Sequence, residues 1–212
     1  NLLEFGRYNS MFALISIGMA FVIMTGGIDL SVGSVAALAS VVSALLSPHN
    51  AVLAIAGGML AGALCGAVNG WVIALLKLQP FIATLAMTLA AHGLALLLAD
   101  NQAVSPSYET GFTDFGQGDW LGIPVPLWVL AVVIVASIVA HVYTAFGRHT
   151  LAIGGSEEAS KLMGLNVPRN LMWVYILSGT LAGLAGVLLA AQGSGQPNEG
   201  MGWDLFAISA VV

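Results

Sequence analysis

A single acidic residue, Asp29, lies between two apolar runs, in the stretch TGGIDLSVGS at 25–34. Asp29 and Ser31 carry oxygens that can accept hydrogen bonds from the backbone amides left open at a helix start. An ionisable side chain within an apolar region can also line the path of a polar solute or contact its gate. Asp29 therefore has two interpretations, a cap of the following helix and a residue of a translocation path, and both can hold together.

Among the other polar side chains within the apolar runs, we consider Asn69, Thr84, Thr88 and His92 as groups that could line a sugar path. Amide and hydroxyl groups can contact a sugar along a path, so Asn69 and Thr84 join Asp29 and Ser31 as candidates for a translocation path or gate. The alternative is that they form hydrogen bonds between helices. His92 has no cysteine or acid at metal-ligand spacing, so we expect a packed or hydrogen-bonded histidine and no metal site.

The composition shows whether the surface of the chain faces water or lipid. Hydrophobic residues make up 58% of the 212 residues and charged residues only 7%, against about 25% charged in a soluble domain. The net charge of −5 argues against nucleic acid as a partner. We therefore predict an all-α, polytopic helical membrane protein embedded in a lipid bilayer. Its apolar segments are expected at 11–24, 31–46, 51–76, 81–99, 125–146 and 170–192.

The two runs that flank Asp29 are short. As helices of 14 and 16 residues they would reach only about 21–24 Å, whereas the hydrocarbon core is roughly 30 Å thick. Gly26, Gly27 and Gly33 allow the backbone to break between them. The sequence thus predicts five to six apolar segments that include a broken or re-entrant pair.

Sidedness follows from the cationic residues. Loop 147–169 holds three of the five Lys and Arg residues, and Lys77 ends an earlier apolar run. Loop 100–124 has no Lys or Arg. The positive-inside rule places 147–169 and Lys77 in the cytoplasm and 100–124 outside.

The loop at 147–169 contains a helix-start signal, because a serine precedes two acidic residues. We expect a short amphipathic helix on the cytoplasmic face. It is either a plain surface connector or a helix on which a cytoplasmic partner docks. The candidate coupling residues are Gly155, Ser156, Glu157, Glu158, Lys161 and Gly164.

Glycines recur every four residues in the third apolar run, at Gly58, Gly62, Gly66 and Gly70. This spacing keeps them on one helix face. Small residues there allow a second helix to approach closely. The face can serve packing within the chain or an interface with another subunit, and the first is favoured.

Several stretches, in this order, resemble the permease subunits of bacterial ABC importers for monosaccharides, a family that includes ribose, xylose, arabinose and galactofuranose permeases. They are GGIDLSVGS, LQPFIATLAM at 78–87 and FGRHTLAIGGSEEASKLMGLNV at 146–167. The final stretch resembles the family's GxELDAIAAVV segment but departs from it at 203–206, so no function is assigned to Asp204. The likeness runs from about residue 9 to the end.

The resemblance implies one transmembrane permease domain over 1–212, truncated at both ends, with 147–169 as its coupling loop. It implies a second permease subunit, a cytoplasmic ABC ATPase and a periplasmic sugar-binding protein as partners, and the bacterial inner membrane as location. No phosphate-binding loop occurs in the chain, so we expect a transport subunit without enzymatic activity or cofactor. A branched-chain amino-acid ABC permease and a secondary transporter are the alternatives.

Overall fold

The computed structural model describes residues 2–212, most of which are helical. The long helices are α1 (Leu2–Met24), α2 (Val32–Leu46), α3 (Ala51–Leu76), α4 (Pro80–Leu98), α6 (Val125–Ile138) and α9 (Val167–Gln192). The shorter elements are α5 (Asp114–Gln117), β1 (Asp119–Trp120), β2 (Ile123–Pro124), the π-helix η1 (Val139–Tyr143), α7 (Ala145–Gly155), α8 (Glu157–Leu162) and α10 (Trp203–Val211). Strands β1 and β2 form a small antiparallel hairpin.

Five helical segments are long and apolar enough to cross a bilayer. They are α1, α3, α4, α6 continued by η1, and α9, whereas α2 has only 15 residues. The predicted fold class, an all-α polytopic membrane protein with five to six apolar segments, is confirmed.

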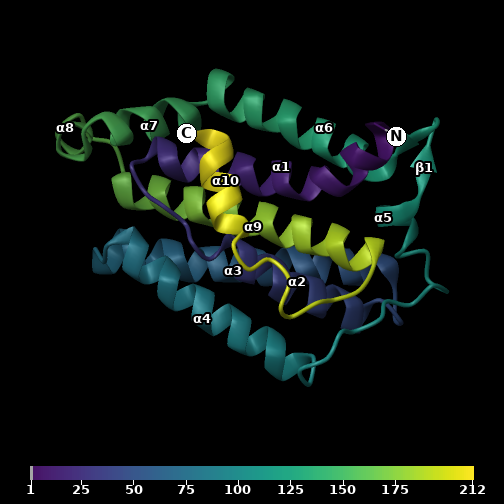
Figure 1. The fold of residues 1–212 in the computed structure, drawn as a ribbon. Helices are drawn as coiled ribbons and strands as arrows, with labels where there is room; N and C mark the ends of the chain where they lie inside the picture. Colours follow the sequence, from purple (N-terminus) through teal and green to yellow (C-terminus); the bar gives the residue numbers. More distant parts are fainter. Residues whose placement is uncertain (1) are drawn as a thin grey trace.

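Helix α9 forms the centre of the bundle. It packs against α1, α2 and α3, and Figure 1 shows α4 and α6 on opposite outer sides. Of the most apolar stretch of α9, 83% is buried, against 6% for the span that contains α6. The apolar side chains that α6 exposes, such as Val132, are therefore available to lipid.

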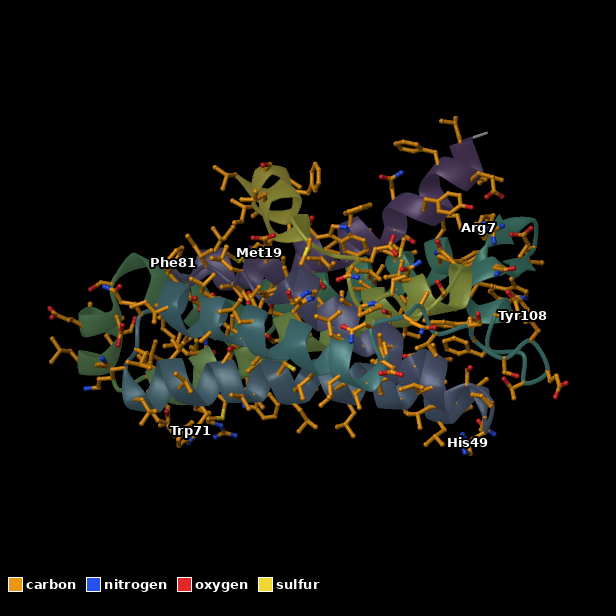
Figure 2. All side chains as sticks on the ribbon, turned by 60° about the horizontal axis from the view of Figure 1, so that its bottom comes forward. Arg7, Met19, His49, Trp71, Phe81 and Tyr108 are labelled. Atoms are coloured by element: carbon orange, nitrogen blue, oxygen red, sulfur yellow. The ribbon has the colours of Figure 1, made fainter. Side chains whose placement is uncertain are left out.

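The bundle has two distinct ends. Helix α8 lies at one end and the β1–β2 hairpin at the other (Figure 1). Figure 2 shows Arg7, His49 and Tyr108 at the end that holds the hairpin, with Trp71 and Phe81 towards the end that holds α8. We refer to these as the α8 end and the β1 end.

The first span is longer than the sequence suggested. The prediction that the run at 11–24 is too short to cross alone was wrong, because α1 begins at Leu2 and has 23 residues. Its first turns contain the charged residues Glu4 and Arg7, which lie outside the apolar run expected at 11–24. Arg7 is buried, forming an ion pair with Asp119 at 2.7 Å and another with Glu4 at 3.2 Å, so the helix continues through it.

Helix α7 was not predicted. The stretch 147–155 is rich in glycine, which lowers helix propensity. Two of these glycines are instead sites of close approach. A Cβ on Gly147 would overlap the carbonyl of His141, and one on Gly154 would overlap the carbonyl of Met24.

Two segments without regular helix enter the bundle. Residues 25–31 precede α2, and residues 193–202 precede α10. Non-helical backbone at membrane depth is tolerated only when it is buried in protein or lines a water-filled cavity. Asp29 and Ser31 are each 1% exposed, so the polar side chains of the first segment are buried in protein, whereas Ile28 is 40% exposed.

Candidate functional site

The Asp29 carboxylate is the centre of a buried polar cluster. Its Oδ1 accepts hydrogen bonds from the Ser31 amide (3.0 Å) and the Ser31 hydroxyl (2.6 Å). Its Oδ2 accepts a hydrogen bond from the Ser178 hydroxyl of α9 at 2.9 Å. Among residues 2–212 the ion pairs involve Arg7 or Lys161, and none includes Asp29. The acid is therefore held by neutral donors alone.

Helix α3 completes this cluster. The Asn69 side-chain amide donates to the Ser31 hydroxyl at 2.9 Å, while that hydroxyl donates to Asp29. Asn69 is 2% exposed and Ser178 is 1% exposed. The chain of donors from Asn69 through Ser31 to Asp29 ties the non-helical segment to α3, and Ser178 ties it to α9.

Helix α4 holds the backbone of the same segment. The Thr84 hydroxyl lies 3.4 Å from the Ile28 carbonyl and 2.9 Å from the Pro80 carbonyl. The Thr88 hydroxyl lies 3.0 Å from the Leu30 carbonyl. The structure thus gathers Asp29, Ser31, Asn69 and Thr84, predicted as path or gate residues, around the single segment 28–31.

The capping geometry differs in detail from the expectation. Ser31 occupies the N-cap position of α2, but its side chain caps no amide of that helix. Asp29 instead accepts from the Ser31 amide itself, in an Asx turn immediately before α2. The Ser31 hydroxyl bonds to Asp29 and Asn69 and to none of the first amides of α2.

Sequence reasoning did not identify Ser178. It lies in the apolar run ILSGT, and a hydroxyl in such a run usually bonds to its own helix. Gly179 and Gly183 lie on a different face of the helix from Ser178, so no pattern in this run signals that its hydroxyl faces another segment.

The glycine face of α3 lies against α9. A Cβ on Gly62 would overlap the Gly179 carbonyl, and one on Gly66 would overlap the Tyr175 carbonyl. Gly70 approaches Met172 of α9, and Gly58 approaches Val187 of α9 and Ser43 of α2. These four glycines are all buried within one chain. The close contact between α3 and α9 fixes Asn69 and Ser178 on either side of Asp29.

The candidate coupling residues form and flank α8. The Ser156 side chain accepts a hydrogen bond from the Ala159 amide at 3.2 Å, as an N-cap does, and Glu157 forms an ion pair with Lys161. Gly164 follows the helix with φ +81°, which suits a helix end. Leu162, the last residue of α8, is 90% exposed. Gly155 ends α7 immediately before Ser156.

A cavity of about 620 Å³ separates α8 from the centre of the bundle. Glu157 and Lys161 of α8 line one side, and Thr25–Gly27 line another. Lys77 and the buried Tyr175 also border it. The segment that holds Asp29 therefore begins in a space that α8 also borders.

A helical bundle with interrupted segments and a buried polar cluster at depth is the architecture of a membrane permease. The sequence profile described as branched-chain amino acid transport system / permease component matches residues 1–212, and the chain belongs to this family.

Curated relatives narrow the class. Over 222 residues the chain is 40% identical to the ribose import permease protein of Escherichia coli, covering all of this chain and 68% of that protein. It is 43% identical to the ribose import permease protein of Bacillus subtilis, covering all of this chain and 67% of the relative. It is 40% identical to the L-arabinose transport system permease protein of Escherichia coli, covering 65% of it. No solved structure matches the chain. The resemblance to ABC permeases for monosaccharides is confirmed.

Proposed function

We propose that the chain is the permease subunit of an ATP-driven ABC importer that carries a monosaccharide across the bacterial inner (plasma) membrane. The observation that supports this most is the identity of about 40% along the whole chain to ribose and L-arabinose permeases. The family description names branched-chain amino acids. The relatives above are all sugar permeases, so sugar is the favoured substrate class.

The α8 end is the cytoplasmic end in this proposal. Arg148, Lys161 and Arg169 lie in the loop at 147–169, and Lys77 borders the cavity beside α8. The opposite loop, 100–124, has only acidic charges. This distribution follows the positive-inside rule and supports a topology in which the β1 end faces outside, where a periplasmic sugar-binding protein would deliver its cargo.

Helix α8 is the proposed docking site for a cytoplasmic ABC ATPase. It protrudes at the end of the bundle (Figure 1) and exposes Leu162 and Met163 beside Glu158. The 620 Å³ cavity gives α8 room to move towards the segment at 25–31. ATP would be hydrolysed on the partner, and this chain would convert the movement of α8 into opening of a path between it and a second permease subunit.

The cluster around Asp29 is the proposed link between docking and path. Donors from α3, α4 and α9 all converge on residues 28–31. A displacement that begins at Thr25–Gly27, beside the cavity, would therefore be transmitted to three helices together. Asp29, Ser31, Asn69 and Thr84 act in this proposal as a gate-positioning unit inside the protein.

A secondary transporter is the competing function. Such proteins place coupling-ion sites near the midplane, and a buried acid is one possible ligand. Asp29, however, already accepts three hydrogen bonds from neighbouring hydroxyl and amide donors. This occupancy favours a structural acid over an ion-exchanging one.

The test is reconstitution of the complete permease with an ABC ATPase that co-purifies with it. Uptake of labelled ribose or arabinose that needs both ATP and a sugar-loaded binding protein would support the proposal. Uptake by the permease alone, driven by a proton or sodium gradient, would contradict it.

A further inference from the structure

The non-helical segment before α10 meets the first turn of α2. A Cβ on Gly33, near the start of α2, would overlap the carbonyl of Gly200, and a Cβ on Gly200 would overlap the carbonyl of Gly33. Gly200 also has φ +88°, a conformation that favours glycine. The starts of α2 and α10 are therefore joined backbone to backbone.

A small cavity of about 180 Å³ opens beside this crossing. We call it the central notch and define its polar lining as Ser34, Thr88, His92 and Asp204. Thr88 is the ninth residue of the 19-residue α4, which places the notch near the middle of that span. Interrupted helices that meet at the midplane are where transporters form substrate sites.

Ser34 is the first sign that the notch accepts a ligand. The residue is 7% exposed, and its hydroxyl has no hydrogen-bond partner in the part of the chain that the structure describes. Buried hydroxyl groups are nearly always paired. An unpaired one that lines a cavity is available to a polar molecule in that cavity.

Asp204 is the second sign. It lies in the first turn of α10, beside the crossing, and its carboxylate forms no ion pair or hydrogen bond within residues 2–212. Its position at a helix start gives some stabilisation from the helix dipole. An acid at membrane depth that has no protein partner nevertheless indicates a cavity or path that it faces.

The remaining two polar residues supply acceptors. His92 Nδ1 lies 3.2 Å from the Pro197 carbonyl, a contact that requires Nδ1 to donate and leaves Nε2 as an acceptor. The Thr88 hydroxyl lies 3.0 Å from the Leu30 carbonyl and 2.9 Å from the Thr84 carbonyl of its own helix, so its hydrogen is already used and its lone pairs stay free. The notch thus combines acceptors from three elements with one hydroxyl that can also donate.

We infer that the central notch is a transient contact site for one monosaccharide ring on its way through the permease, with Ser34 and Asp204 as the groups that bind its hydroxyls. This inference rests on the proposed function. A sugar offers several hydroxyl donors to the acceptors, and Leu89 and Met201 give its C–H face an apolar wall. The small volume admits a single ring, far below the 300–1,000 Å³ of pockets for drug-sized ligands.

The test uses the complete permease–ATPase complex in proteoliposomes with saturating sugar-loaded binding protein. We expect Ser34→Ala to slow uptake about three- to tenfold, because a net hydrogen bond of this kind changes an equilibrium or rate by that order. Asp204→Asn should slow it tenfold or more, since hydrogen bonds to a charged group are stronger. Ser209→Ala, on α10 and bonded only to the Leu205 carbonyl, is the matched control and should behave as wild type.

A second readout separates contact with sugar from a structural role. The wild type should carry monodeoxy analogues more slowly than the parent sugar, because a site built to bond a hydroxyl rejects an analogue that lacks it. Ser34→Ala should lose this preference for one analogue and keep it for the others. Unchanged uptake in both variants, or an equal loss for every analogue, would overturn the inference.

Failure of the proposed function would look different. If the wild-type complex showed no ATP hydrolysis stimulated by loaded binding protein, the importer assignment itself would fail, and the sugar assignment of the notch with it. Normal stimulation and uptake in the wild type, combined with indifference of the Ser34 and Asp204 variants, would overturn the notch alone.

Discussion

Asp29 and Ser178 are 149 positions apart in the sequence, yet the Ser178 hydroxyl donates a 2.9 Å hydrogen bond to the Asp29 carboxylate. Both residues are 1% exposed. This bond joins the non-helical segment before α2 to the central helix α9. It is the contact through which a movement near the α8 end would reach the core.

Ser178→Ala should therefore destabilise the permease. Removing one donor from a buried acid is expected to lower the free energy of unfolding by about 1–3 kcal/mol, seen as a lower thermal unfolding midpoint in detergent. Thr180→Ala is the matched control, because its hydroxyl bonds to Ile176 of its own helix. Equal midpoints for both variants would contradict the role given to Ser178.

Asp29→Ala should impair transport more than Ser178→Ala, because it leaves the hydroxyls of Ser31 and Ser178 without their acceptor. Uptake in proteoliposomes and the amount of permease in the membrane are the measurements. Normal uptake at normal abundance would show that Asp29 is a dispensable turn residue.

Because α3 and α9 are in close contact, we expect any side chain added at their closest point to lower the stability of the protein. Gly62→Ala should reduce stability by about 1–3 kcal/mol, because the new Cβ would overlap the Gly179 carbonyl. Gly93→Ala in α4 is the control, since its Cβ would meet nothing within 4 Å. It should be neutral or slightly stabilising, by up to about 1 kcal/mol, and a drop as large as that of Gly62→Ala would refute the packing argument.

Replacing Glu157, Glu158 and Lys161 together by alanine should uncouple ATP hydrolysis from uptake. The exposed ion pair between Glu157 and Lys161 contributes only about 0.3–0.5 kcal/mol, so the thermal midpoint should barely change. ATPase activity and sugar uptake are measured on the same vesicles. Uptake at the wild-type rate would exclude α8 as the coupling element.

The orientation of the bundle can be tested with single cysteines in a Cys65→Ala background. A cysteine at Ser156 should react with a membrane-impermeant reagent only from the cytoplasmic side. One at Tyr108, 69% exposed at the β1 end, should react only from outside. The reverse pattern would invert the proposed topology.

Composition and periodicity predicted the fold class, the number of spans and the helix at 157–162, because lipid exposure and helix-start chemistry are local properties. They misjudged the start of α1, since nothing local shows that Arg7 pairs with Asp119. They missed α7, since a glycine reads as a breaker unless its close neighbour is known.

Part of the candidate site could be predicted from the sequence and part of it could not. Asp29 was recognisable as an acid in an apolar region. Its partner Ser178 and the notch between Ser34 and Asp204 depend on contacts between segments far apart in the chain. No pattern within one segment encodes such contacts.

The central claim is that this chain is a sugar permease driven by a separate ATPase. Sugar uptake by the complete complex, measured with and without ATP and with and without the loaded binding protein, tests it most directly. We expect uptake only when both ATP and the loaded binding protein are present. Uptake without ATP that follows an imposed ion gradient would contradict it.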